Sequence, residues 1–356
     1  MRNDTAYDFS ADIVRIIGTI AVVAIHVTDA LIILPNHFGG FSWWWGNLIN
    51  SFSRTAVPLF IMLSGYLLLN PKKKINNNFY KKRIARVIIP FIFWYFFYLF
   101  WNHYHNRLTY KISTQIYNFF TLSLGHLYFL IVIFFLYLIT PWIRQVLYSK
   151  TDFELQKIII IIFFIAFVTT IVIYAFPFLV LAKNIFTLPF FYLAYYLYGL
   201  LIRKKTINKK TIFFLGLICI GATVLTTVLV YLNTKNKFFW NYNFGQYFHE
   251  SFSPLIIIMS LSLFTILIKL KKFFQSKLKK FTFFIKKISV LTFGIYLIHP
   301  LIIDLVNTYL HLNIHEMHNA IWFWISIKIF IVFIISALIV ELYQLTKFFV
   351  GGPKET

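Results

Sequence analysis

Apolar segments of membrane-spanning length recur along almost the whole chain. A helix needs about 20 mostly apolar residues to cross the hydrocarbon core of a bilayer. Ten segments fit this pattern: 9–34, 47–70, 86–102, 126–147, 158–176, 185–202, 211–232, 252–269, 288–310 and 320–346. Hydrophobic residues make up 60% of the sequence and charged residues 13%, which leaves no room for a soluble catalytic domain. The sequence therefore predicts an all-α polytopic membrane protein with about ten transmembrane helices in a single domain, residues 1–356.

The net charge of +23 would suggest a nucleic-acid partner for a soluble protein, but its distribution indicates a membrane protein. With a cytoplasmic N-terminus, most Lys and Arg fall in the inner segments 1–8, 71–85, 148–157, 203–210, 270–287 and 347–356. The outer loops hold only Arg107, Lys111, Lys183, Lys235 and Lys237. Because cytoplasmic loops are enriched in Lys and Arg, we predict that both termini are cytoplasmic. The basic charge then serves topology and attraction to anionic lipid, so the expected partner is the lipid bilayer and not nucleic acid.

The first apolar segment carries four ionisable side chains, Asp12, Arg15, His26 and Asp29. Arg15 and His26 lie about 20° apart around a helix and about 16 Å apart along it. Ionisable groups at membrane depth are costly, so they tend to face a protein interior or a water-filled cavity. This polar face is therefore predicted to line a functional site. The alternative is two local contacts, Asp12 with Arg15 and His26 with Asp29.

Further ionisable groups fall at the outer ends of other segments. The candidates are Arg54 in the second segment, His126 at the start of the fourth, Glu250 in the loop before the eighth and His299 in the ninth. Pro58 is expected to bend the second helix near Arg54. For His299, which precedes Pro300, a structural role and a functional role are equally open.

Several common site motifs are missing from the sequence. It has no Walker A motif, no G-x-G-x-x-G and no C-x-x-C pair, and Cys219 is its single cysteine. The spacing of His311, His315 and His318 in the last outer loop is typical of metal ligands, but a hydrophilic loop is the favoured interpretation. No metal site is therefore predicted.

An ordered set of motifs resembles a known family. Asp-x-x-Arg with a later His stands in the first segment, and Arg-x-x-x-Pro-Leu-Phe-x-x-Leu-Ser-Gly-Tyr in the second. Lys-Lys-Arg-x-x-Arg-x-x-x-Pro enters the third, His-Leu-Tyr-Phe-Leu opens the fourth and Ile-Tyr-Leu-Ile-His-Pro lies in the ninth. Over nearly the whole chain this set resembles the acyltransferase-3 family, in its short stand-alone form. The resemblance implies a multi-pass enzyme of the bacterial cytoplasmic membrane that acylates extracytoplasmic glycans.

The resemblance also implies roles by position. Arg15 and His26 match the arginine and histidine of the family's first span, and Arg83 and Arg86 match its paired arginines at the third. The implied donor is cytoplasmic acyl-coenzyme A, whose phosphates Arg83 and Arg86 would bind, with Arg15 further along the donor's path. Ordinary positive-inside anchoring is the alternative for the pair. No permanently bound cofactor is expected.

His26 is the candidate general base for an acceptor hydroxyl, or else a nucleophile that forms an acyl-enzyme. Asp29 or a backbone carbonyl is expected to set its tautomer. Arg54 is expected to stabilise negative charge or to bind an acidic acceptor. The acceptor sugar is expected to meet three more side chains, His126, Glu250 and His299.

The predicted function is transfer of an acyl group, with acetyl favoured, from acetyl-coenzyme A or another acyl-coenzyme A to a hydroxyl of an extracytoplasmic carbohydrate. The main alternative is an exporter or flippase of exopolysaccharide or a lipid-linked sugar. A small-solute carrier has little support, because no helices broken by Gly or Pro recur at matching places in two halves.

Overall fold

The computed structural model describes residues 8–33, 37–70, 78–105, 112–120, 124–147, 150–176, 179, 184–236, 247–313 and 320–349. Within these ranges every regular element is helical, which confirms the predicted all-α class. The α-helices are α1 (Phe9–Ile33), α2 (Phe41–Ser53), α3 (Ala56–Leu68), α4 (Phe79–Tyr104), α5 (Ile112–Phe120), α6 (Tyr128–Leu147), α7 (Asp152–Ala175), α8 (Thr187–Lys204), α9 (Lys209–Asn236), α11 (Pro254–Lys269), α12 (Lys271–Lys277), α13 (Thr282–Tyr309) and α14 (Ile321–Phe349). Two short 3-10 helices are η2 (Gly125–Leu127) and η4 (Lys279–Phe281).

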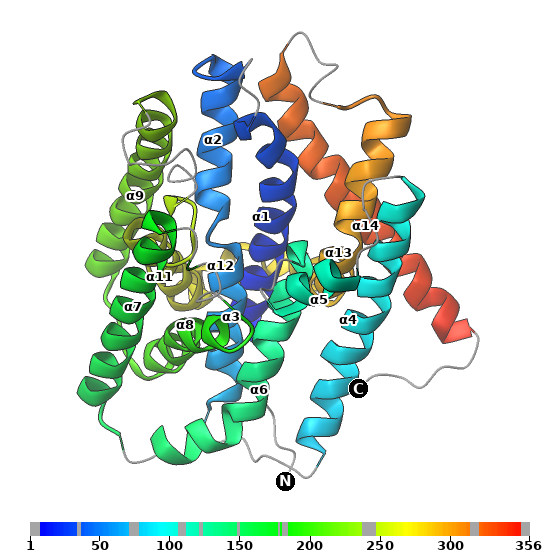
Figure 1. The fold of residues 1–356 in the computed structure, drawn as a ribbon. Helices are drawn as coiled ribbons and strands as arrows, with labels where there is room; N and C mark the ends of the chain where they lie inside the picture. Colours follow the sequence, from blue (N-terminus) through cyan, green and yellow to red (C-terminus); the bar gives the residue numbers. More distant parts are fainter. Residues whose placement is uncertain are drawn as a thin grey trace.

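Helix α1 runs through the middle of the bundle, while α7 and α9 lie at one edge and α4 at the other (Figure 1). It packs against α2, α3, α13 and α14, and also against α11 and α12. More than half of its residues are buried. The polar face of the first segment therefore lies inside the protein, where ionisable groups are far less costly than in lipid.

In the described ranges, eight helical stretches are long and apolar enough to cross a membrane. Each coincides with one of the predicted segments, so the chain is a multi-pass membrane protein. The two other predicted segments form α8, with 18 residues, and α11, with 16 residues. At 1.5 Å per residue α11 is about 24 Å long, shorter than a hydrocarbon core of about 30 Å. The total of ten spans stays a prediction.

The second predicted segment is broken into two helices. Helix α2 ends at Ser53 and α3 begins at Ala56, so the interruption falls at Arg54 and Thr55, just before Pro58. Proline has no N–H for the carbonyl four residues earlier, and its ring clashes with that carbonyl inside a helix. That carbonyl belongs to Arg54. Pro58 is the third residue of α3. Its missing N–H costs no hydrogen bond there, because the N–H groups of the first turn have no partner within a helix.

Three helices begin earlier than hydropathy predicts. Helix α4 begins at Phe79 instead of residue 86, α7 at Asp152 instead of 158 and α13 at Thr282 instead of 288. The added turns contain several polar or basic residues and no Gly or Pro. Hydropathy marks the hydrocarbon core, whereas Lys and Arg continue a helix while their charged ends reach the interface. Helix α5 lies in the connection between α4 and η2, outside the ten predicted segments.

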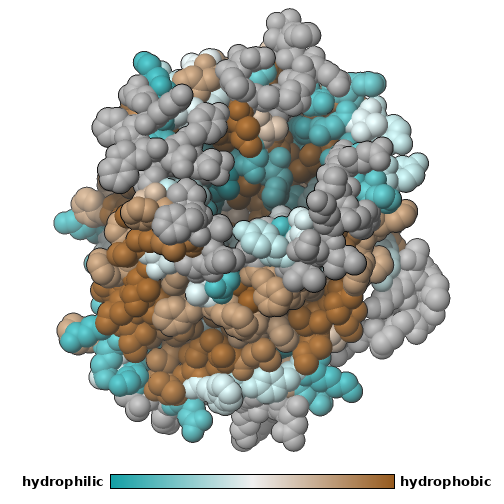
Figure 2. Space-filling view, in the orientation of Figure 1, coloured by the Kyte–Doolittle hydropathy of each residue, from teal (hydrophilic) through white to brown (hydrophobic). Residues whose placement is uncertain are grey.

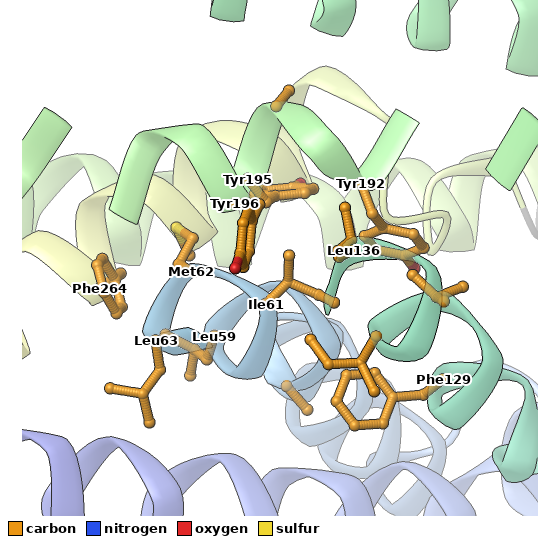
Figure 3. Close-up of a cluster of buried hydrophobic side chains, with 14 of the residues drawn as sticks. Leu59, Ile61, Met62, Leu63, Phe129, Leu136, Tyr192, Tyr195, Tyr196 and Phe264 are labelled. Atoms are coloured by element: carbon orange, nitrogen blue, oxygen red, sulfur yellow. The ribbon is translucent and has the colours of Figure 1, made fainter. Parts of the chain in front are cut away.

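The largest buried cluster joins α3, α6, α8 and α11 (Figure 3). Tyr196 of α8 points toward α3, and its hydroxyl hydrogen-bonds Thr140 of α6 at 2.7 Å. Two glycines let the backbones of α3 and α8 approach closely. A Cβ on Gly65 would collide with the backbone of Tyr196, and one on Gly199 with the backbone of Met62. Small residues at helix contacts are the usual solution for packing inside a membrane.

The outer surface is that of a protein embedded in lipid. Large exposed apolar side chains cover α4, α7 and α9, and Figure 2 shows a broad hydrophobic zone across this face. Above this zone the face is hollowed, and the side chains visible inside the hollow are hydrophilic. A hydrophilic recess in an otherwise apolar body is typical of a site that polar groups enter.

The basic segment 270–287 lies beside the beginning of α1 and the last part of α14. Asp8, which precedes α1, pairs with Lys271 at 3.4 Å. Lys287 pairs with Glu341 of α14. The two ends of the helical bundle therefore lie on the same side, as an even number of spans requires. That this side is cytoplasmic stays a prediction based on the loop charges.

Cysteine labelling tests this orientation. In a chain with Cys219→Ser, a membrane-impermeant maleimide should label Lys235→Cys in intact cells, because residue 235 follows the apolar part of α9 on the predicted outer side. Lys280→Cys should react only after permeabilisation, because it lies in the basic inner segment. Labelling of Lys280→Cys from outside, without labelling of Lys235→Cys, would reverse the proposed topology.

Candidate active site

Three histidines from distant parts of the sequence meet in one group, the histidine cluster: His26 of α1, His126 of η2 and His299 of α13. The ring centroids of His26 and His299 are 5.1 Å apart, and those of His126 and His299 are 5.2 Å apart. The rings of His26 and His126 are separated by 6.2 Å. His299 is fully buried, whereas the other two are partly exposed. The fold thus joins the predicted base to two predicted acceptor-binding residues.

The orientation of His299 is fixed by its own helix. Pro300 lies inside α13 and has no N–H for the carbonyl four residues earlier, which is that of Tyr296. This carbonyl accepts a hydrogen bond from Nδ1 of His299 at 2.7 Å. Since a carbonyl can only accept, Nδ1 carries the hydrogen. The opposite nitrogen, Nε2, is buried and has no hydrogen-bond partner in the described chain.

Two tyrosine hydroxyls hold the elements around the histidine cluster together. Tyr98 of α4 donates to the carbonyl of Leu297 at 2.8 Å, and its ring meets His126 edge-on at 5.2 Å. Tyr296 donates to the carbonyl of His126. These bonds tie α4 and η2 to α13, and they place His126 beside His299.

Arg54 lies next to the histidine cluster at the break between α2 and α3. Its Nη2 donates to Asp29 at 2.7 Å and its Nε to the side-chain oxygen of Asn50 at 2.8 Å. Asn50 in turn donates to Asp29 at 2.9 Å and to Thr28 at 2.9 Å. The charges of Asp29 and Arg54 both act on His26. The arginine predicted at this depth is therefore compensated by a carboxylate of α1.

Asp29 is engaged by α2 and not by His26. No hydrogen bond to the His26 ring is found in the part of the chain that the structure describes. The local contact of His26 with Asp29, which belongs to the alternative interpretation, is therefore not formed in the described chain, and neither is a bond by which Asp29 would set the tautomer. The physical reason is that Arg54 binds Asp29 as a full ion pair, and Asn50 adds a second hydrogen bond to the same oxygen.

On its other side Arg54 faces the loop before α11. Glu250 accepts a hydrogen bond from the hydroxyl of Tyr174 at 2.8 Å. Nε2 of His249 lies 3.1 Å from Oγ of Ser51, on α2. Burial, together with the positive charge of Arg54, holds the pKa of His249 well below its ordinary value, so this ring is neutral. Glu250 thus lies in a polar region that adjoins Arg54, outside the histidine cluster.

Arg15 occupies the other end of α1. It forms an ion pair with Asp12 at 2.7 Å, so this one of the two alternative local contacts is present. Ser289 of α13 donates to the same carboxylate oxygen at 2.6 Å and lies 3.4 Å from the guanidinium. The second oxygen of Asp12 is buried and lacks a partner among the described residues. About a third of the Arg15 side chain (36%) is exposed, so its charge can meet a ligand.

Arg83 and Arg86 lie in the first turns of α4. The guanidinium of Arg83 lies over the rings of Phe79 and Tyr137, at 5.4 and 5.2 Å from their centroids. Its Nε is buried and unpaired in the described structure. Arg86 is exposed, and within the described ranges neither arginine forms an ion pair with a carboxylate.

Of the three histidines with metal-like spacing, His315 and His318 lie outside the described residues. His311 is exposed. In the described ranges no group of three or more His, Cys, Asp or Glu is arranged to hold a metal ion.

A family model described as an acyltransferase domain matches residues 8–341, nearly the whole chain. The chain belongs to the acyltransferase-3 family. Comparisons with curated proteins and with solved structures gave no match. Family membership makes this acyltransferase-3 protein an acyl-transferring enzyme of the membrane. The matched range includes the histidine cluster, Arg54, Arg15 and the two arginines of α4.

Sequence reasoning missed several residues of the acyltransferase-3 site. Asn50 and Ser289 were not singled out, because a neutral polar residue in an apolar helix gives a weak signal. His249 stands next to Glu250 in the sequence, but nothing local indicates its contact with Ser51. One signal was available: the order Tyr296, His299, Pro300 places a histidine one turn from a carbonyl that proline leaves free.

The pairing of Asp29 with Arg54 can be tested by a double-mutant cycle in this acyltransferase. Asp29→Asn and Arg54→Gln should each lower the Tm of the purified protein by about 2–4 °C, because each leaves an uncompensated partner. The double variant should lose less than the sum. Lys150→Ala, which removes an exposed pair with Glu154, serves as the control and should leave the Tm unchanged. Strictly additive losses would show that the two groups do not depend on each other.

Proposed function

We propose that this enzyme transfers an acyl group, most simply acetyl, from cytoplasmic acyl-coenzyme A to a hydroxyl of an extracytoplasmic carbohydrate. Membership of the family supports acyl transfer. The observation that supports this particular reaction is the histidine cluster, whose member His26 lies on the same central helix as Arg15, about 16 Å further along it. A donor that enters beside Arg15 would carry its thioester along α1 toward His26.

In the proposed reaction His26 removes the proton of the acceptor hydroxyl while the hydroxyl oxygen attacks the thioester carbonyl carbon. The C–S bond then breaks, the thiolate leaves and it takes the proton from His26. An ester and free coenzyme A are formed, so atoms and charge balance. Nη1 of Arg54 is used by neither of the bonds to Asp29 and Asn50. It is the donor that would stabilise the negative carbonyl oxygen.

Arg83 and Arg86 are proposed to bind the phosphates of the donor. Two guanidinium groups three residues apart share one face of a helix, and bidentate contacts to phosphate are typical of arginine. The cation–π contacts of Arg83 with Phe79 and Tyr137 support this role, because they hold the guanidinium without a carboxylate partner among the described residues.

The first test measures release of free thiol in proteoliposomes supplied with acetyl-coenzyme A on the cytoplasmic face. The wild-type enzyme should release coenzyme A slowly without acceptor, by transfer to water. His26→Ala should reduce this release by roughly 10²-fold or more, since a general base is lost. His105→Ala, an exposed imidazole at the end of α4, is the matched control and should keep the wild-type rate. If no acyl-coenzyme A is bound or consumed while a glycan crosses the bilayer, the exporter alternative replaces this proposal.

The second test concerns the donor site. Arg83→Ala and Arg86→Ala should each raise the donor KM about tenfold or more with little change in kcat, because one charge-assisted contact is worth roughly 1.5–3 kcal/mol. Lys82→Ala removes an exposed cation of the same turn and should leave the donor KM unchanged. Equal effects of all three variants would indicate general surface charge instead of a phosphate site.

A further inference from the structure

A histidine that acts as a base needs a partner that holds its second nitrogen. In a neutral imidazole one nitrogen carries a hydrogen and the other presents a lone pair, and the bond made by the first decides which is which. In this site Oδ1 of Asp29 is bound to Arg54 and Asn50, and in the described chain no hydrogen bond joins Asp29 to the His26 ring. The other groups near this ring are therefore the candidates for its partner.

His299 has the properties that this partner requires. Its Nδ1 hydrogen is committed to the carbonyl of Tyr296, so Nε2 of the neutral ring is a hydrogen-bond acceptor. Nε2 is fully buried and unpaired in the described chain. Leaving a buried acceptor unsatisfied costs about 1–3 kcal/mol. A donor is therefore expected to reach this atom at some stage of the reaction.

The nearby hydroxyl donors are already in use. Tyr98 donates to the carbonyl of Leu297, and Tyr296 donates to the carbonyl of His126. Among the described residues, two further rings contact His299, those of His26 at 5.1 Å and His126 at 5.2 Å. Two imidazoles joined by an N–H···N bond have ring centres about 5 Å apart. The His26 ring is thus at the distance of a hydrogen-bonded pair, and rotation about its own side-chain bond is the motion that would form the bond.

We propose that His299 is a positioning residue that orients His26 through a chain of hydrogen bonds. The carbonyl of Tyr296 holds Nδ1–H of His299, and Nε2 of His299 accepts the N–H of His26. The other nitrogen of His26 then presents its lone pair to the acceptor hydroxyl. When His26 takes the proton, its bond to Nε2 becomes charge-assisted and therefore stronger. This inference rests on the proposed function, in which His26 is the base.

Pro300 is part of the same arrangement. With any other residue at this position, a backbone N–H would compete for the carbonyl of Tyr296. His299 would then lose the bond that fixes its tautomer. Pro300 therefore acts on His26 indirectly. It frees the carbonyl of Tyr296, and this carbonyl then sets which nitrogen of His299 accepts a hydrogen bond.

The test uses two substitutions of His299, one that keeps a group at the position of Nδ1 and one that keeps a group at the position of Nε2. Asn places an amide near the position of Nδ1, so His299→Asn keeps the bond to Tyr296 but lacks a group at Nε2. Gln extends an amide to the position of Nε2, so His299→Gln keeps an acceptor there. With full-length enzyme in proteoliposomes and acetyl-coenzyme A as the probe, His299→Asn should lower kcat on the order of 10²-fold. His299→Gln should recover about tenfold of that loss.

Donor affinity decides between positioning and packing. The donor KM should stay at its wild-type value in both His299 variants, because the donor site is unchanged. Pro300→Ala should lower kcat about tenfold, also without a change in donor KM. A wild-type kcat in His299→Asn would overturn the proposal. So would equal losses in the Asn and Gln variants, or a loss of donor binding in both, because a residue that only fills space or stabilises the fold gives those results.

The same measurements keep this proposal separate from the proposed function. If His26→Ala releases thiol at the wild-type rate, the proposed function itself fails. If His26→Ala is inactive while His299→Asn is fully active, the proposed function stands and only the role of His299 fails. His105→Asn is the matched control, since His105 is an exposed imidazole at the end of α4, outside the site. It should keep the wild-type acceptor-free kcat.

Discussion

Ionisable side chains at membrane depth need partners, and this need determines how the central helices pack. Arg15 and Asp12 meet Ser289, which joins α1 to α13. Asp29 meets Arg54, which joins α1 to the break after α2. Each contact lowers the free-energy cost of placing a charged side chain at membrane depth, a cost that is highest where the side chain faces lipid. With both ends of α1 fixed in this way, His26 lies between α2 and α13, and the histidine cluster follows.

Much of the fold follows from patterns that a single segment contains. Apolar length predicts the spanning helices, and helical periodicity places Arg15 and His26 on one face. The meeting of His26 with His126 and His299 could not be predicted in this way, since periodicity gives the face of a helix and not the helix that it contacts. Helix beginnings were also misplaced, because hydropathy marks the edge of the hydrocarbon core. The early start of α4 at Phe79 shows that the helix continues beyond that edge.

Two irregularities of the backbone, both at proline, shape the site. Pro58 ends the continuous helix and leaves Arg54 at a helix terminus, where its side chain reaches Asp29. Pro300 frees the carbonyl that binds His299. Irregular backbone in a membrane is tolerated where the protein supplies partners for the freed groups. At Pro300 this partner is a side chain of the proposed site, His299.

The histidine cluster also limits how much charge the site can hold. Three imidazoles with ring centres 5.1–6.2 Å apart repel one another strongly if more than one is protonated, above all where water is scarce. The cluster is therefore expected to carry at most one positive charge at a time. The proposed reaction needs only one proton, taken from the acceptor hydroxyl and returned to the leaving thiolate. His299 suits this cycle because its Nδ1–H bond keeps Nε2 free of hydrogen, so it binds the proton on His26 without adding a second charge.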